Sequence, residues 1–431
     1  MRGRKLLLAQ IWVCLIIVNI NIFNNKVVAK NDSAEDEYTY IKVNLNEGNY
    51  SEYTLNNSKF LQNAKNFIDD CLNNKSYYTL PTEMKGQPKI SIFITVYNKE
   101  KYLNFVLKSI QNQSLRDFEI IFVDDFSSDN SVALIEGFIK EDPRITLIKN
   151  DKNRNVLFSY FQGVIHSKGE YLLSVDPDDM LANPRILEIA YYYAKKYEAD
   201  ILQFDRVMGN YSNLVYNYRP NKHRKELLKK PMINELFYRE KKGKLNKSNR
   251  ELWDKLVLRE LYMEAMEELH DEIINKHLRM NYYSDMIVNF LLYKYASSYY
   301  YIDEIGYFYY RNEDSVWNIN KNLTKKLANI NNHFDFAFFV TQRLNNFYRE
   351  KVLALYEFKL LGKEVLVYGN DVLYEKLLAF AEILRKESVL KEREMRTIDE
   401  ILEGVENERK FRICTVNKFY LKGGLETEVL C

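Results

Sequence analysis

The sequence predicts an α/β fold built on a doubly wound, mostly parallel sheet. Between residues 90 and 204, short apolar runs alternate with segments whose apolar residues recur at helical spacing. Acidic or aromatic residues follow the first, second and fourth of these runs. Strands that alternate with helices form parallel sheets, and such sheets bind ligands beyond the carboxyl ends of their strands. A ligand site is therefore expected at that edge.

Each element of this alternation has its own pattern. The strand candidates are runs rich in β-branched and aromatic residues, which favour buried strands. The segments between them carry Leu, Val, Ile or Phe three or four residues apart, which favours helices. Ser127-Ser128-Asp129 offers an N-cap for the second helix. The predicted order is strand 90–96, helix 99–113, strand 118–123, helix 132–139, strand 145–148, helix 158–166, strand 171–175, helix 186–197 and strand 201–204.

The rest of the chain is less regular. Residues 251–310 are predicted to be mostly helical and to end in a short strand. A helical accessory region is expected over residues 346–431, with charged helices over 373–402. Within it, Glu364–Tyr368 is rich in valine and is predicted to be a strand, and Phe411–Val416 is a second strand candidate.

The N-terminus resembles a secretory signal. Arg2, Arg4 and Lys5 precede an apolar run over residues 6–23, so residues 1–29 are predicted to be a signal peptide or an uncleaved signal anchor, and both remain open. Residues 30–88 are polar and rich in asparagine and are interpreted as a stem, with an amphipathic helix over Lys59–Leu72. We therefore expect a protein of the secretory pathway, either secreted or a single-pass type II membrane protein of the ER or Golgi.

Composition excludes several classes of protein. The 431 residues are 46% hydrophobic and 28% charged, which is typical of a globular protein. Lys and Arg number 62 against 60 Asp and Glu, and this balance argues against nucleic acid as a partner. Four isolated cysteines without a CxxC motif argue against a zinc site. The basic stretch 219–250 is either a solvated loop or a charged flap near a phosphate-bearing ligand.

Polar residues gather at the predicted strand ends. Thr95 and Tyr97 close the first strand, Asp124 and Asp125 follow the second, and Asp176-Pro177-Asp178-Asp179 follows the fourth. Carboxylates this close repel one another, so a cation is expected among them. Oxygen ligands without His or Cys suit Mg²⁺ or Mn²⁺, which bind substrate phosphates. The alternative for any single Asp pair is a turn or a helix cap.

Residues 89–205 resemble the family 2 glycosyltransferases, which are inverting enzymes of the GT-A fold. The resemblance covers a little over a quarter of the chain. Its motifs follow the family in order: Ser91-Ile-Phe-Ile-Thr-Val-Tyr-Asn, then Tyr102-Leu103, Ser109-Ile110 and Gln113, then Phe118-Glu-Ile-Ile-Phe-Val-Asp-Asp-Phe-Ser-Ser-Asp, then Gly163 and Gly169-Glu-Tyr-Leu-Leu-Ser-Val-Asp-Pro-Asp-Asp.

The resemblance implies a nucleotide-sugar donor, with a UDP-sugar favoured, and an acceptor hydroxyl on a glycan, protein or lipid. It also implies that residues 89–218 form the donor half and 219–345 the acceptor half of the domain. For the nucleoside, the resemblance implies that Thr95 and Tyr97 hold the base, that Asp125 binds the uracil edge and that Asp176 contacts the ribose. For the diphosphate, it implies that Asp178 holds Mn²⁺ or Mg²⁺ and that Asp179 is a second carboxylate near the metal.

Two further residues follow from the resemblance. An inverting transferase needs a general base, and Asp285 in Tyr283-Ser284-Asp285-Met286 occupies the family's position, with Ser284 where Glu is usual. The alternative is that Asp285 caps a helix. Arg311 closes a Tyr-Arg segment and would contact either the diphosphate or a carboxylate.

The chain also departs from the family at two places. Asn155 replaces the Gly of an Asn-x-Gly, and Tyr160-Phe161 replaces an Arg-Asn whose Arg faces the donor. These departures leave open the alternative of a catalytically inactive GT-A protein that binds sugar nucleotides or glycans. The intact acidic set instead favours a metal-dependent inverting glycosyltransferase.

Overall fold

The computed structural model describes residues 40–41, 52–83, 86–210, 213–217, 226–230, 233, 236, 238–239, 244–245, 250–312, 323–343, 348–368, 371–386 and 392–421. The predicted signal or anchor lies outside them, as does most of the basic stretch 219–250. Among the helices that the structure describes, none has the length and apolar character needed to cross a membrane.

The predicted parallel sheet is confirmed. Strands β2 (Ile90–Val96), β3 (Phe118–Asp124), β4 (Ile145–Lys149) and β5 (Tyr171–Ser174) pair in parallel in the order β5-β2-β3-β4. They are joined by helices α3 (Leu103–Gln111), α4 (Ser131–Glu141) and α5 (Asn155–Ile165). Every residue of β3 is buried, as expected for a central strand covered on both faces.

The other half of the sheet differs from the prediction. Strand β12 (Lys255–Leu258) lies antiparallel between β5 and β7 (Ile201–Asn210), so the predicted fifth strand does not pair with the fourth. β7 pairs in parallel with β13 (Ser298–Tyr310), a strand of 13 residues where a short one was expected. Shorter strands complete the described sheets: β1 (Tyr40–Ile41), β6 (Met180–Leu181), β8 (Asn213–Asn217), β9 (Leu228–Lys229), β10 (Tyr238–Arg239) and β11 (Lys244–Leu245).

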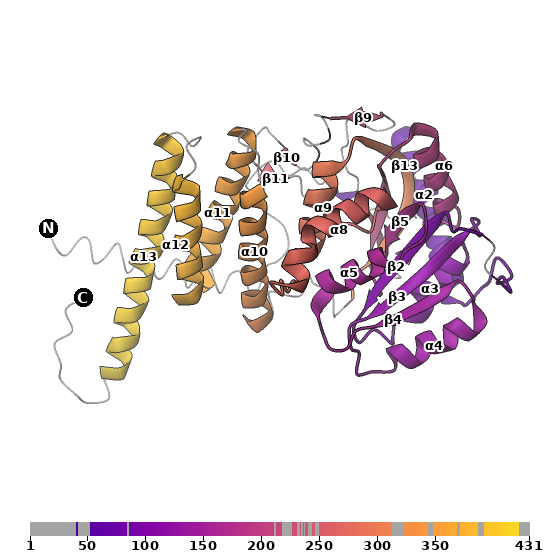
Figure 1. The fold of residues 1–431 in the computed structure, drawn as a ribbon, viewed down its shortest axis with the longest axis horizontal. Coiled ribbons are helices and arrows are strands. Elements are labelled where there is room, and N and C mark those ends of the chain that lie inside the picture. Colours follow the sequence, from indigo (N-terminus) through magenta and orange to yellow (C-terminus); the bar gives the residue numbers. More distant parts are fainter. Residues whose placement is uncertain are drawn as a thin grey trace. The chain divides into compact units, whose positions relative to one another are not determined.

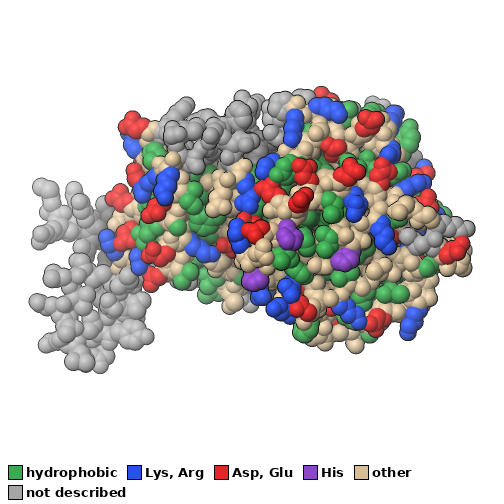
Figure 2. Space-filling view, viewed as in Figure 1, with side chains coloured by type: hydrophobic (Ala, Val, Ile, Leu, Met, Phe, Trp, Pro, Cys, Tyr) green, Lys and Arg blue, Asp and Glu red, His purple; other side chains and the backbone are tan. Residues whose placement is uncertain are grey.

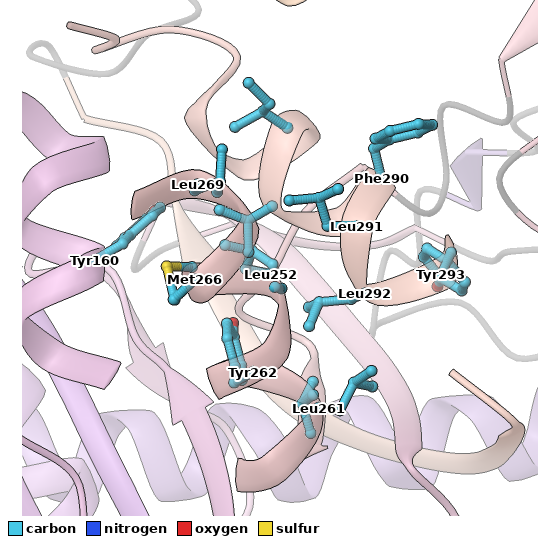
Figure 3. Packing of buried hydrophobic residues seen from close by; sticks show 14 of the residues in the cluster. Tyr160, Leu252, Leu261, Tyr262, Met266, Leu269, Phe290, Leu291, Leu292 and Tyr293 are labelled. Atoms are coloured by element: carbon cyan, nitrogen blue, oxygen red, sulfur yellow. The ribbon is translucent and has the colours of Figure 1, made fainter. Parts of the chain in front are cut away.

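Two apolar layers cover the sheet, one on each face. Alternation along β2 sends Ile92 and Ile94 into the layer under α3 and α6 (Ile186–Tyr197), and Phe93 into the opposite layer. That opposite layer contains α5, α8 (Arg259–Ile274) and α9 (Ser284–Tyr295). Figure 3 shows part of it, where Tyr160 points from α5 toward Met266 of α8. The fold is thus the predicted doubly wound α/β type (Figure 1).

The amphipathic helix predicted over Lys59–Leu72 is confirmed as α2 (Glu52–Leu72). Its buried face, with Phe67 and Ile68, packs against Val207 and Phe308 of the sheet. The free thiol of Cys71 is buried in the same cluster. This helix of the expected stem therefore contributes to the core of the α/β domain.

The C-terminal region is helical, and its two predicted strands are wrong. It consists of α10 (Leu323–Arg343), α11 (Tyr348–Tyr368), α12 (Asp371–Lys386) and α13 (Glu392–Leu421), with their own apolar cluster. Glu364–Tyr368 is the last turn of α11, because Phe358, Leu361 and Val365 share its buried face at helical spacing. Phe411–Val416 lies inside α13. On the face seen in Figure 2, acidic and basic side chains are interspersed.

Candidate active site

The loops after β2 and β3 are bound to each other at the carboxyl edge of the sheet. Asn98 adopts a left-handed backbone (φ 52°), and its Oδ1 accepts the N–H of Ser128 at 2.8 Å. In return, the Ser127 hydroxyl oxygen accepts the N–H of Asn98 at 2.9 Å. Thr95 is half-buried in β2 opposite Val123, and the ring of Tyr97 is 50% exposed beside this loop. An exposed ring at this edge is available to stack on a flat ligand.

Asp125 organises the next loop. The carboxylate of this buried residue accepts Asn150 Nδ2 at 2.8 Å and the backbone N–H groups of Arg154 and Asn155 at 2.7 and 2.9 Å. Burial raises the pKa of Asp125, and these hydrogen bonds oppose the rise. Asp125 is therefore a positioned carboxylate at the place where the resemblance expects a nucleobase contact.

The first departure from the family keeps the backbone shape of the motif. Asn155 has φ 71°, in the left-handed region that Gly adopts freely and Asn tolerates best among the other residues. Its Nδ2 donates to Asn281 Oδ1 at 3.1 Å, a contact that Gly cannot make. The substitution thus preserves the turn and adds a link to the loop before α9.

Three carboxylates follow β5. Asp176 and Asp178 are half-buried, and Asp179 is buried at 1% exposure. Burial raises the pKa of Asp176 and of Asp179 well above the ordinary value, and mutual repulsion with Asp178 raises both further. The Tyr307 hydroxyl accepts the N–H of Asp176 at 3.0 Å, and Asp179 Oδ1 accepts the N–H of Tyr310 at 2.8 Å. Strand β13 therefore fixes this carboxylate turn.

Asp178, the predicted metal ligand, has two partners that the sequence reasoning missed. Lys99 Nζ lies 2.8 Å from Asp178 Oδ2, and Asn312 Nδ2 donates to the same oxygen at 2.9 Å. The described residues contain no group of three or more His, Cys, Asp or Glu side chains arranged to hold a metal ion by themselves. The donor set still fits a hard cation, because Asp178 keeps its Oδ1 and phosphate oxygens would complete the shell.

Asp285 lies in the first turn of α9, and the loop before this helix is hydrogen-bonded to the donor side through Asn281 and Asn155. Its charge raises the pKa of Asp176, although the two residues are far apart in the sequence. Burial raises the pKa of Asp285 itself, the Ser284 hydroxyl at 3.1 Å and Lys255 lower it, and Glu251 raises it. The loop before the candidate base is linked to the loop that Asp125 holds, because Asn155 bonds to both Asn281 and Asp125.

Two buried tyrosines pack against Phe93 of β2, and the sequence did not point to their role. Tyr160 and Tyr262 both pack edge-on against Phe93, with ring centroids 5.9 Å away in each case. The charge of Asp285 raises the pKa of both, after the larger effect of burial. The second departure from the family therefore places a neutral hydroxyl group where a cation was expected.

Arg311 follows β13 and is exposed. Its backbone N–H donates to Gly209 at 2.7 Å, and its Nη2 lies 3.3 Å from the sulfur of Met208. Its neighbour Asn312 makes the contact to Asp178. The segment therefore reaches the acidic turn, with Asn312 as the side chain bound to it.

The fold and the acidic strand ends together define a domain of the GT-A glycosyltransferase type. Residues 91–257 match the glycosyl transferase family 2 profile. The sequence resemblance is thereby confirmed. The chain is 33% identical over 129 residues to glycosyltransferase GlyG of Streptococcus pneumoniae serotype 4, which covers 30% of this chain and 40% of that protein.

Other known proteins agree with this assignment. Cholesterol galactosyltransferase of Borreliella burgdorferi is 32% identical over 187 residues, covering 41% of this chain and 49% of that protein. The crystal structure of S. aureus TarS 1-349 in complex with UDP shares the fold, with a TM-score of 0.51 and 17% identity over 79% of this chain and 94% of that chain. The chain spans about half or less of the length of the curated relatives it matches.

Proposed function

We propose that the chain is a metal-dependent inverting glycosyltransferase that moves a sugar from a nucleotide-diphosphate donor to an acceptor hydroxyl. The observation that carries the proposal is the hydrogen bond of 3.1 Å between Asn155 and Asn281, which links the loop held by Asp125 to the loop before the candidate base, Asp285. UDP is the favoured nucleotide, since TarS, which shares the fold, was solved with UDP. The acceptor class is a glycan, a glycoprotein or a glycolipid.

The donor would bind along the carboxyl edge of the sheet. The exposed ring of Tyr97 would stack on the base beside Thr95, and Asp125 would accept hydrogen bonds from its edge. Asp176 would accept from the ribose hydroxyls. Lys99, which pairs with Asp178, and Arg311, which follows β13, would contact the diphosphate.

At the anomeric carbon, transfer forms one bond and breaks one. Asp285 takes the proton of the acceptor hydroxyl, whose oxygen attacks the anomeric carbon from the face opposite the leaving group. The bond between that carbon and the diphosphate oxygen breaks, and the electron pair leaves with the nucleotide, so the configuration inverts. The raised pKa of Asp285 makes its carboxylate a better proton acceptor than an exposed Asp.

A divalent cation, Mn²⁺ or Mg²⁺, would stabilise the charge that develops on the leaving diphosphate. Asp178 would hold it through the oxygen that Lys99 and Asn312 leave free, and Asp179 would be a second carboxylate near it. The N-terminal basic and apolar pattern supports action inside the secretory pathway, at a luminal acceptor.

A catalytically inactive binding protein is the second candidate. The Lys99–Asp178 ion pair favours it, because Lys99 already neutralises the carboxylate that a metal would use. Both candidates would bind a nucleotide, but only the glycosyltransferase would turn over a sugar donor.

A donor screen tests the proposal. The full chain is incubated with Mn²⁺ and a panel of UDP-sugars and GDP-sugars, and release of the free nucleotide is measured. We expect release from one donor, stimulated by acceptor glycans and lost in Asp285→Asn. Binding of nucleotide without release from any donor would support the inactive alternative.

A further inference from the structure

The residue two positions before the candidate base has an unusual conformation. Tyr283 is the N-cap of α9 and adopts φ 65°, in the left-handed region that side chains of this size rarely occupy. Its carbonyl oxygen accepts the N–H of Ile287 at 3.0 Å, so this residue sets where α9 begins and how Asp285 is presented. Such a conformation persists only where the surroundings hold it.

Side chains of the C-terminal helix α10 pack against the ring of Tyr283. His333 of α10 stacks on it, with centroids 4.6 Å apart and an interplanar angle of 10°, and Phe336 stacks at 5.7 Å. His333 is buried and its Nε2 is hydrogen-bonded to the carboxyl group of Glu357 on α11, which is also buried. A chain of contacts therefore runs from α11 through His333 to the start of α9.

Helix α10 also holds the backbone of the same loop. Asn332 Oδ1 accepts the N–H groups of Asn281 and Tyr282 at 3.3 and 3.2 Å, and its Nδ2 donates to the carbonyl oxygen of Arg279 at 3.3 Å. From the donor side, Asn155 Nδ2 bonds to Asn281 at 3.1 Å. The loop over residues 279–283 is thus held between the donor-binding half and α10.

We propose that His333, Glu357 and Asn332 are positioning residues that hold Tyr283 and thereby orient Asp285 for proton transfer. The proposal deepens the proposed function and rests on Asp285 being the base. It assigns a role to the C-terminal region: α10 and α11 hold the loop that precedes Asp285. Misplacing a catalytic group by a fraction of an ångström slows the chemical step while leaving ligand binding intact.

Steady-state kinetics separate positioning from simple packing. In His333→Ala and in Asn332→Ala, kcat is expected to fall by about tenfold to a hundredfold. The KM for donor and the affinity for UDP should change less than about twofold, because Asp125 and the acidic turn are untouched. His333→Phe keeps a ring against Tyr283 and should recover part of kcat.

Asp335→Asn is the matched control. Asp335 lies on α10 two residues from His333, and it pairs with Lys376 of α12 at 3.2 Å, away from the loop. This variant should keep the wild-type kcat. Equal kcat in folded Asn332→Ala, His333→Ala and Asp335→Asn would overturn the proposal, as would a loss of UDP affinity that matches the loss of kcat.

A readout without turnover keeps the two proposals apart. Amide hydrogen exchange over residues 279–287 should be faster in His333→Ala and Asn332→Ala than in the wild type and Asp335→Asn. If no donor is turned over but exchange rises as expected, the positioning contacts stand and the proposed reaction fails. If exchange in both variants equals that of Asp335→Asn, the positioning proposal fails whatever the activity.

Discussion

Lys99 Nζ lies 2.8 Å from Asp178 Oδ2, so the carboxylate of the candidate metal ligand already forms an ion pair within the chain. Both side chains are mostly buried, with 21% and 16% of their surface exposed, so water screens the pair only in part. Lys99 also lowers the pKa of Asp176, against burial and repulsion. The ammonium group therefore stabilises the acidic turn while no other cation is bound to it.

Removing this ammonium group should strengthen the binding of divalent cations. In Lys99→Met, Asp178 loses a competitor for its carboxylate, and Mn²⁺ alone should bind on the order of tenfold more tightly. Calorimetric titration without nucleotide measures the affinity. Lys101→Met, in the same loop and exposed, is the control and should match the wild type. Weaker Mn²⁺ binding by Lys99→Met would show that Lys99 does not compete with the metal.

The pH profile should report the environment of Asp285. A general base must be deprotonated, so activity falls as pH drops through its pKa, and burial raises that pKa. The acid limb of kcat/KM should therefore lie above the ordinary Asp value of about 4. In Glu251→Gln the limb should move to lower pH, because a charge that raises the pKa is gone. A limb at an unshifted value, or one unchanged in Glu251→Gln, would contradict this assignment.

Substitution of alanine for glycine should lower the free energy of unfolding at Gly169 and raise it at Gly137. A Cβ on Gly169 would meet the backbone nitrogen of Ser91 at 2.4 Å, and backbone cannot give way cheaply, so Gly169→Ala should lose about 3 kcal/mol of unfolding free energy. At Gly137, inside α4, a Cβ meets nothing within 4 Å among the described residues. Gly137→Ala should gain about 0.5–1 kcal/mol. Urea unfolding measures both, and equal effects would refute the close packing at Gly169.

Asn155 should tolerate glycine better than alanine. Its φ of 71° costs an alanine about 1–2 kcal/mol, whereas glycine adopts it without penalty and loses only the contact to Asn281. Thermal unfolding of both variants gives the order, with Asn155→Gly the more stable. Both variants lack the contact to Asn281, so the reverse order would contradict the left-handed backbone at this position.

The parallel half of the sheet could be predicted from local sequence patterns. Each strand from β2 to β5 is a short apolar run, and each helix between them shows apolar residues at helical spacing within its own segment. It did not reveal β12, a four-residue strand whose place depends on pairing with Leu173 and Ile201, both distant in the sequence. The error at Glu364–Tyr368 has a different cause. Its valines favour strands on their own, but Val365 continues the buried face of α11.

The residues of the candidate site also divide into those that local patterns predict and those that depend on contacts distant in the sequence. Asp125, Asp176, Asp178 and Asp179 could be proposed from the sequence, because strand ends identify the ligand-binding edge. Lys99 and Asn312 could not, since their contacts to Asp178 span 79 and 134 residues. Tyr262 could not either, because a tyrosine at helical spacing is indistinguishable in the sequence from ordinary core.

UDP binding by the full chain tests the central claim most directly. UDP is titrated by calorimetry with and without Mn²⁺ into the wild type and into Asp178→Asn. The account predicts binding that is strengthened by Mn²⁺, and that this strengthening is lost in Asp178→Asn while the variant stays folded. A folded wild type that binds no UDP under either condition would contradict the UDP-dependent site, and a Mn²⁺ effect that survives in Asp178→Asn would contradict the metal assignment.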